Sequence, residues 1–166
     1  MSEGKMLGKG IFIKCTECKK EYILDESGFL KATDNETKFN HIPDWYAWQR
    51  ECVKEEIEKG EYSFSSPVKI LVGGDTKHIF DVGHGTLTHG KDGFTLTGCD
   101  GTLEYTQKPQ ASYSICADFF WYEIGDVIVI GNSKALYYCF PEDKNVCVAK
   151  IRLAAEEMYK TYKKDR

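Results

Sequence analysis

Two cysteines, Cys15 and Cys18, have the types and spacing most suited to chemistry: they stand three positions apart between two short β-favouring runs. Thiolates at positions i and i+3 of a tight turn can occupy two corners of a tetrahedral zinc site. The pair is typical of one knuckle of a zinc ribbon, and both residues are candidate zinc ligands. The chain has no second C-x-x-C pair, so further ligands would come from His41, from Cys52 or from the same pair in a second chain. The alternative is a degenerate knuckle whose hairpin folds without metal.

The other cysteines have no motif around them, and we expect them to be small buried apolar residues. An odd total of seven, without regular spacing, indicates a reduced, intracellular protein rather than a disulfide framework. The five residues are Cys52, Cys99, Cys116, Cys139 and Cys147.

Patterns for catalysis are weak in this chain. His41 and His78 each precede an acid by three residues, Asp44 and Asp81, but no G-x-S-x-G nucleophile elbow accompanies them. The glycine pairs lack the following Lys-Ser/Thr that a phosphate-binding loop requires. We therefore predict no catalytic residue. A thiol-dependent or hydrolytic enzyme is the alternative, and one cysteine of unusual reactivity would indicate it.

Three aromatic residues, Trp45, Tyr46 and Trp48, lie close together where the sequence predicts a helix. Such a cluster can enter a membrane interface or receive an apolar partner, so the three are candidate binding residues. More often it docks a helix against a neighbouring sheet, and we favour that interpretation.

The 166 residues divide into two predicted parts, 1–60 and 61–166, at a change in apolar period. The first part contains a zinc-ribbon-like β-hairpin and a helix from Pro43 to a stop at Gly60. Its predicted strands are 11–15, 21–24 and 29–32.

The second part alternates short strands with glycine-rich turns and ends in an amphipathic helix, whose apolar stripe is Val148, Ile151, Ala155, Met158 and Tyr162. Strands followed by one capping helix predict a pleckstrin-homology-like antiparallel β-barrel, so the fold class is α+β. The predicted strands are 62–65, 68–72, 77–82, 85–89, 94–97, 102–106, 112–117, 119–124, 127–130 and 135–140.

Charge limits the partners. The net charge is −4, and residues 61–141 contain five lysines, no arginine and nine acids. We therefore expect no nucleic-acid partner and no phosphoinositide recognition, since both need clustered basic residues. The basic end of the last helix gives at most weak membrane association. No apolar run approaches the ~20 residues of a membrane-spanning helix.

Several runs, taken in order, resemble the C-terminal accessory region of bacterial lysophospholipid acyltransferases of the 1-acylglycerol-3-phosphate type, as found in clostridia. The similarity covers the chain from about residue 11, and the most distinctive run is His-Ile-Pro-Asp-Trp-Tyr at 41–46. Those enzymes use a histidine and an aspartate separated by four residues and a Glu-Gly-Thr-Arg-like phosphate site, and this chain has neither. The matching runs are 15–18, 24–28, 41–48, 62–64, 85–89, 92–94, 113–116 and 155–159.

The resemblance implies a non-catalytic accessory or positioning module, which would lie at the cytosolic face of the membrane beside an acyltransferase catalytic domain or another protein. Zinc is its one candidate cofactor. The alternative is an independent lipid- or protein-binding module with a pleckstrin-like fold.

Overall fold

The computed structural model describes residues 5–34, 36–74 and 78–164, and the chain divides into two compact units, Met1–Cys52 and Val53–Arg166. The described residues form two antiparallel sheets and two α-helices, so the predicted α+β class is confirmed. The boundary between the units falls inside the first helix, α1 (Ile42–Glu58).

The first unit is built on a four-stranded antiparallel sheet of order β1-β2-β3-β4. Its first strand was not predicted, because Met6–Lys9 is short and contains a glycine. Side chains from the sheet, from the segment between β4 and α1, and from the start of α1 form its core: Tyr22, Leu30, Ala32, Phe39 and Trp45. The strands are β1 (Met6–Lys9), β2 (Phe12–Cys15), β3 (Glu21–Leu24) and β4 (Leu30–Ala32).

Helix α1 ends where the sequence predicts. The Gly60 N–H donates to the carbonyl of Ile57, and the Glu61 N–H donates to that of Glu56. These two bonds form a Schellman motif, which requires a left-handed residue, and Gly60 has φ +71°.

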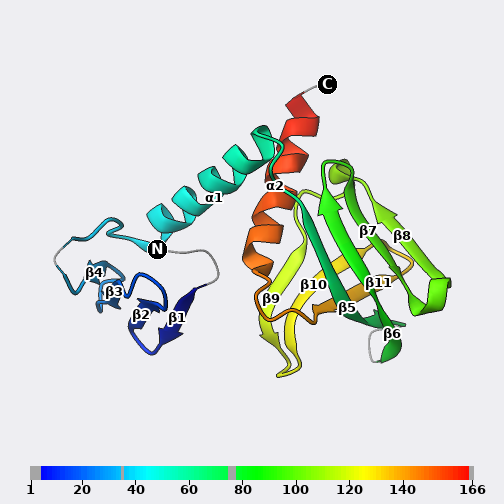
Figure 1. The fold of residues 1–166 in the computed structure, drawn as a ribbon, viewed down its shortest axis with the longest axis horizontal. Coiled ribbons are helices and arrows are strands. Elements are labelled where there is room, and N and C mark those ends of the chain that lie inside the picture. Colours follow the sequence, from blue (N-terminus) through cyan, green and yellow to red (C-terminus); the bar gives the residue numbers. More distant parts are fainter. Residues whose placement is uncertain (1–4, 35, 75–77, 165–166) are drawn as a thin grey trace. The chain divides into compact units, whose positions relative to one another are not determined.

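The second unit contains a seven-stranded antiparallel sheet of order β8-β7-β6-β5-β11-β10-β9 (Figure 1). In the described residues β8 and β9 lie at the two ends of this order and do not pair, so the ladder is open rather than a closed barrel. The strands are β5 (Phe64–Gly73), β6 (Ile79–Gly90), β7 (Gly93–Gly98), β8 (Leu103–Gln107), β9 (Cys116–Trp121), β10 (Gly125–Gly131) and β11 (Leu136–Pro141).

Two of these strands are longer than predicted. The segments 62–65 and 68–72 belong to one strand, β5, which passes through Pro67. The Pro67 carbonyl accepts from the Glu142 N–H just past the end of β11, so its missing N–H breaks no bond to β6. Segments 77–82 and 85–89 are likewise replaced by β6, with an irregularity in register opposite Ile70 and Leu71; residue 77 lies outside the described residues.

Two other predicted strands have different limits. Residues 112–115 precede β9 rather than forming part of it, and residues 122–124 form the turn between β9 and β10. Pairing of Trp121 with Gly125 places that turn before the predicted one at 125–126.

Helix α2 (Val148–Lys164) packs on one face of the seven-stranded sheet, which we call the inner face. Val148, Ile151, Ala155 and Met158 of the predicted stripe are buried, whereas Tyr162 is exposed and donates its hydroxyl to the Lys91 carbonyl at 2.7 Å. The C-terminal part of α1, from Val53 onward, belongs to this unit too: Val53 packs with Leu153 and Ala154 of α2.

Two facing glycines make the centre of the inner face possible. Gly85 of β6 is paired with Gly98 of β7, and the Cδ1 of Ile70 lies over both. A Cβ on Gly85 would come within 2.2 Å of the Thr97 carbonyl oxygen and 2.9 Å of Ile70 Cδ1. The first contact is with backbone, so the ladder itself would have to shift.

We predict that Gly85→Ala lowers the free energy of unfolding by about 2–3 kcal/mol, because overpacking there displaces backbone. Gly90→Ala is the matched control: it is also in β6, and a Cβ there meets nothing within 4 Å. Urea denaturation of both variants measures the difference, and equal stabilities would contradict the packing argument.

Candidate functional site

The face of the seven-stranded sheet opposite α2, which we call the outer face, is also apolar. Side chains alternate along a strand, so Ile128 and Ile130 of β10 join the inner core while Val127 and Val129 face outward. The outward residues belong to a second cluster, of which three members are buried. The cluster is Leu71, Val127 and Phe140, with Trp121, Val129 and Tyr138 packed against them.

A row of aromatic rings crosses this outer face. The Trp121 ring stacks on Tyr138 with 5.0 Å between centroids, and it contacts Phe140 at 5.9 Å. Tyr122 meets Trp121 edge-on at 4.6 Å. These rings shield one another and the neighbouring apolar side chains from solvent, so the cluster is buried although α2 packs on the other face of the sheet.

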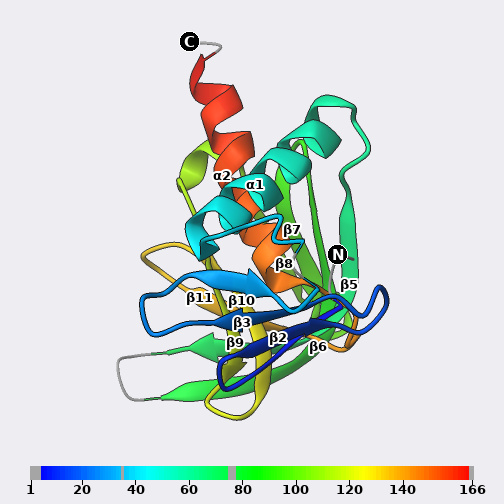
Figure 2. The same ribbon diagram turned by 90° about the vertical axis from the view of Figure 1, so that its left-hand side faces the viewer.

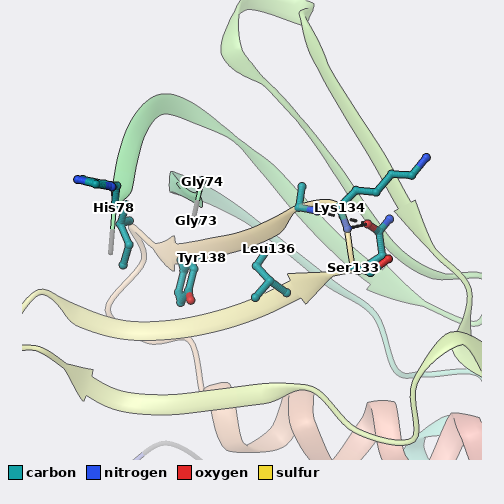
Figure 3. Close-up of a pocket in the computed structure, with 10 residues that line it drawn as sticks. Gly73, Gly74, His78, Ser133, Lys134, Leu136 and Tyr138 are labelled. Atoms are coloured by element: carbon teal, nitrogen blue, oxygen red, sulfur yellow. Dashed lines mark hydrogen bonds between the residues drawn. The ribbon is translucent and has the colours of Figure 1, made fainter. Parts of the chain in front are cut away.

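A hollow of about 490 Å³ lies at one end of the outer face. It is centred on Gly73, whose neighbours in the ladder are Leu136 of β11 and Ile79 of β6. Gly73 has no side chain to fill the space between them, and a Cβ there would stand 3.5 Å from the Tyr138 ring. The hollow therefore has an apolar floor (Figure 3).

The rim of the hollow is polar. Asn132 accepts backbone N–H bonds through its Oδ1 from Lys134 at 2.8 Å and from Ala135 at 3.3 Å. In Figure 3 the Lys134 side chain extends away from the hollow. Apolar side chains and polar groups thus both line the hollow, so it can offer a small ligand apolar contact and hydrogen bonds.

One ion pair lies beside the apolar cluster. Lys69 and Asp81 face each other across β5 and β6, with 2.8 Å between Nζ and the Asp81 Oδ2. The hydrogen bond from Lys69 is the main cause that holds the pKa of Asp81 below its usual range. The two charges of this surface pair neutralise each other, so the pair does not strongly attract a charged ligand of either sign.

The two candidate zinc ligands have different environments in the first unit. Cys15 is fully buried, whereas Cys18 is exposed. The Cys15 N–H donates to the Lys20 carbonyl and the Lys19 N–H to that of Cys15, which closes the turn. Lys19 has φ +61°, a left-handed conformation that glycine adopts at lower cost.

The further ligands considered, His41 and Cys52, have other surroundings in the described residues. His41 lies against the ring of Phe29, with 5.4 Å between centroids, and Cys52 is half-buried on α1. In the part of the chain that the structure describes, no three His, Cys, Asp or Glu side chains are grouped as a metal site would need. We derive no metal chemistry from this turn.

The predicted aromatic binding residues are divided between core and surface. Trp45 is buried and lies parallel to Phe39 at 6.1 Å, and Trp48 is half-buried with its ring 5.3 Å from Phe39. Tyr46 is exposed, with the Arg50 guanidinium 5.4 Å from its ring. Two of the three rings thus pack within the first unit.

Two buried titratable groups are held neutral. His89 stacks on Phe94 at 3.8 Å, its Nδ1 lies 2.9 Å from the Tyr62 hydroxyl, and burial lowers its pKa to about 4. Burial raises the pKa of the Cys139 thiol to about 12. Neither group is suited to proton transfer or nucleophilic attack near neutral pH.

Comparisons with family models, with characterised proteins and with solved structures found no match to this chain. Among the described residues, no helix is both long and apolar enough to cross a bilayer.

Sequence reasoning missed the outer face altogether. The predicted strand at 119–124 gives no indication of an apolar outer face, and the glycine pairs are considered only as phosphate loops, although Gly73 ends β5. Four consecutive aromatic residues, Phe119 to Tyr122, were the available signal, because an edge strand seldom carries so many large rings.

The buried His89 predicts a specific pH dependence. Between pH 6.5 and about 4 the unfolded chain binds a proton at this residue and the folded protein does not. Lowering the pH through this window should therefore remove about 3 kcal/mol from the free energy of unfolding. Urea denaturation across this pH range measures the change in the free energy of unfolding. The variant His89→Gln is a non-titrating control, and subtracting its profile removes the pH dependence that comes from the carboxylates. Parallel pH profiles would contradict a neutral buried imidazole.

Burial also predicts which cysteines react. In the native protein, Cys18 and Cys116 are exposed and should be alkylated rapidly by iodoacetamide, while Cys15 and Cys139 should react only after unfolding. Peptide mass spectrometry at successive times gives the order. Protection of Cys18 that a chelator removes, with zinc found by elemental analysis, would contradict the arrangement described here and support the zinc knuckle.

Proposed function

We propose that this chain works by binding rather than by catalysis, as an accessory module that positions a phospholipid-synthesising acyltransferase or its substrate. Its second unit would be a pleckstrin-homology-like domain, and its first a zinc-ribbon-like hairpin followed by a helix.

The strand order supports the pleckstrin-like assignment and is the observation on which the proposal rests. The first strand of the second unit, β5, is paired with its last, β11, and the C-terminal helix α2 packs on the inner face of the sheet. This is the arrangement expected of a small antiparallel domain that is capped by a C-terminal helix.

The first unit supports the ribbon-like assignment through its turn. Cys15 and Cys18 stand at the connection of β2 and β3, and the left-handed Lys19 follows at the position where a knuckle needs such a residue. The hairpin conformation is therefore present with its backbone bonds made. Zinc itself remains a prediction.

The acyltransferase context is supported by the resemblance of the ordered runs at 15–18, 41–48 and 155–159. In this chain those runs have structural roles. Trp45 is in the core of the first unit. Glu156 of α2 accepts a hydrogen bond from the Ser114 hydroxyl at 2.8 Å, which holds the segment before β9.

A second candidate function, an independent lipid- or protein-binding module, is favoured by the outer face. The hollow at Gly73 and the aromatic row of Tyr138, Trp121 and Tyr122 offer a binding surface that needs no second domain.

The acylation assay tests the proposal. We expect the purified chain to transfer no acyl group from an acyl thioester to lysophosphatidate, with product measured by mass spectrometry. Added to the catalytic domain of a lysophosphatidate acyltransferase that lacks its accessory region, it should raise the rate severalfold. Turnover by the chain alone would refute the proposal; no effect in trans would favour the independent module.

A further inference from the structure

The most exposed apolar segment of the second unit is the turn that joins β9 to β10. Phe119, Phe120, Tyr122 and Ile124 expose 60%, 69%, 81% and 54% of their surfaces. With Trp121 and Glu123 they form residues 119–124, which we call the aromatic tip. Figure 1 shows β9 and β10 running together to this turn, and Figure 2 shows it again as a free end of the sheet.

The backbone of the aromatic tip is held in a costly conformation. Phe120, Tyr122 and Glu123 have φ of 54°, 44° and 61°, all left-handed, although none is glycine or asparagine. Phe120 and Tyr122 are 69% and 81% exposed, and Tyr122 has one edge-on contact, with Trp121, so packing offsets little of the strain. Strain of this kind is concentrated at sites of function.

Four backbone N–H groups of the aromatic tip already make hydrogen bonds within this hairpin. The Phe119 N–H donates to Asp118 Oδ1 at 2.8 Å, and the Phe120 N–H donates to Asp126 Oδ1 at 3.0 Å. The N–H groups of Glu123 and Ile124 donate to the carbonyls of Phe120 and Trp121. These four donors would not need water if the tip left it, which is a requirement for entry into a bilayer.

The charged side chains around the aromatic tip determine which kind of bilayer it can bind. The sequence has no lysine or arginine from residue 109 to residue 133, while Asp118, Glu123 and Asp126 surround the tip. Anionic headgroups would be repelled. A zwitterionic surface presents outward ammonium groups to the carboxylates and an interface in which tryptophan and tyrosine are favoured.

The size of the tip argues against a protein as its occupant. A stable protein interface takes roughly 20–30 residues on each side, and the tip offers six. Shallow insertion into a lipid interface needs no such area.

We propose that the aromatic tip inserts into the headgroup region of zwitterionic phospholipid bilayers and attaches the second unit to the membrane. The inference rests on the proposed function as a binding module, and it names the surface and the partner. Phe119, Phe120, Tyr122 and Ile124 enter the interface, and Glu123 stays among the headgroups.

Vesicle co-sedimentation tests the proposal. The full chain should bind phosphatidylcholine vesicles with a partition coefficient that salt does not reduce, and added phosphatidylglycerol should weaken binding. The double variant Phe120→Ser/Tyr122→Ser should lower the coefficient at least tenfold. Phe80→Ser is the matched control, since Phe80 is 56% exposed on β6, outside both the tip and the hollow, and it should bind as the unchanged protein does.

Circular dichroism and thermal unfolding check the fold of each variant. If the double variant fails to fold, Phe119→Ser replaces it, because Phe119 does not have a left-handed backbone conformation. Subtracting the fluorescence emission of Trp121→Phe from that of the unchanged protein gives the emission of Trp121. This emission should shift to shorter wavelength when vesicles are added.

Equal binding by the tip variants, or binding that requires anionic lipid and is lost in salt, would overturn the inference. A third result would also overturn it: sedimentation velocity shows that the unchanged protein is a dimer, the double variant is a monomer, and the unchanged protein does not bind vesicles. The tip would then be a contact between two copies of the chain. None of these outcomes bears on the acylation assay, so failure of the tip leaves the proposed function standing.

Discussion

The second unit depends on the pairing of β5 with strands on both of its sides. This strand is the first of its sheet, yet it lies between β6 and β11, so the sheet cannot form until the two ends of the unit meet. Alternation along β5 then serves two purposes. Val68 and Ile70 point into the core under α2, whereas Leu71 and Gly73 face outward and supply part of the apolar cluster and the centre of the hollow.

This arrangement explains which predictions could be made from the sequence. The apolar stripe of α2 and the end of α1 at Gly60 follow from local rules of periodicity and capping. The end of α1 is confirmed, and the stripe is confirmed except for Tyr162, which is exposed. The merging of strands across Pro67 depends on where β11 ends, which no local pattern contains. The open ladder likewise depends on whether β8 and β9 pair, which is a relation between distant segments.

The candidate site was less accessible to sequence reasoning, for a physical reason in each case. The hollow comes from Gly73 standing opposite Leu136 and Ile79, so it requires the register of three strands. The left-handed Phe120 and Tyr122 contradict residue preference, and only the closed hairpin imposes them. Cys15 and Cys18 form the turn that their spacing indicates, but further ligands had to come from elsewhere in the fold.

Burial and charge together underlie the proposal that this chain works by binding through apolar contact. His89 and Cys139 are kept neutral in the core, and Lys69 is engaged by Asp81. The hollow and the aromatic tip lie at opposite ends of the β10–β11 pair, since Gly131 pairs with Leu136 at one end and the turn before Gly125 forms the other. One stiff pair of strands therefore connects both surfaces. A module anchored at the tip would leave the hollow open to a second ligand.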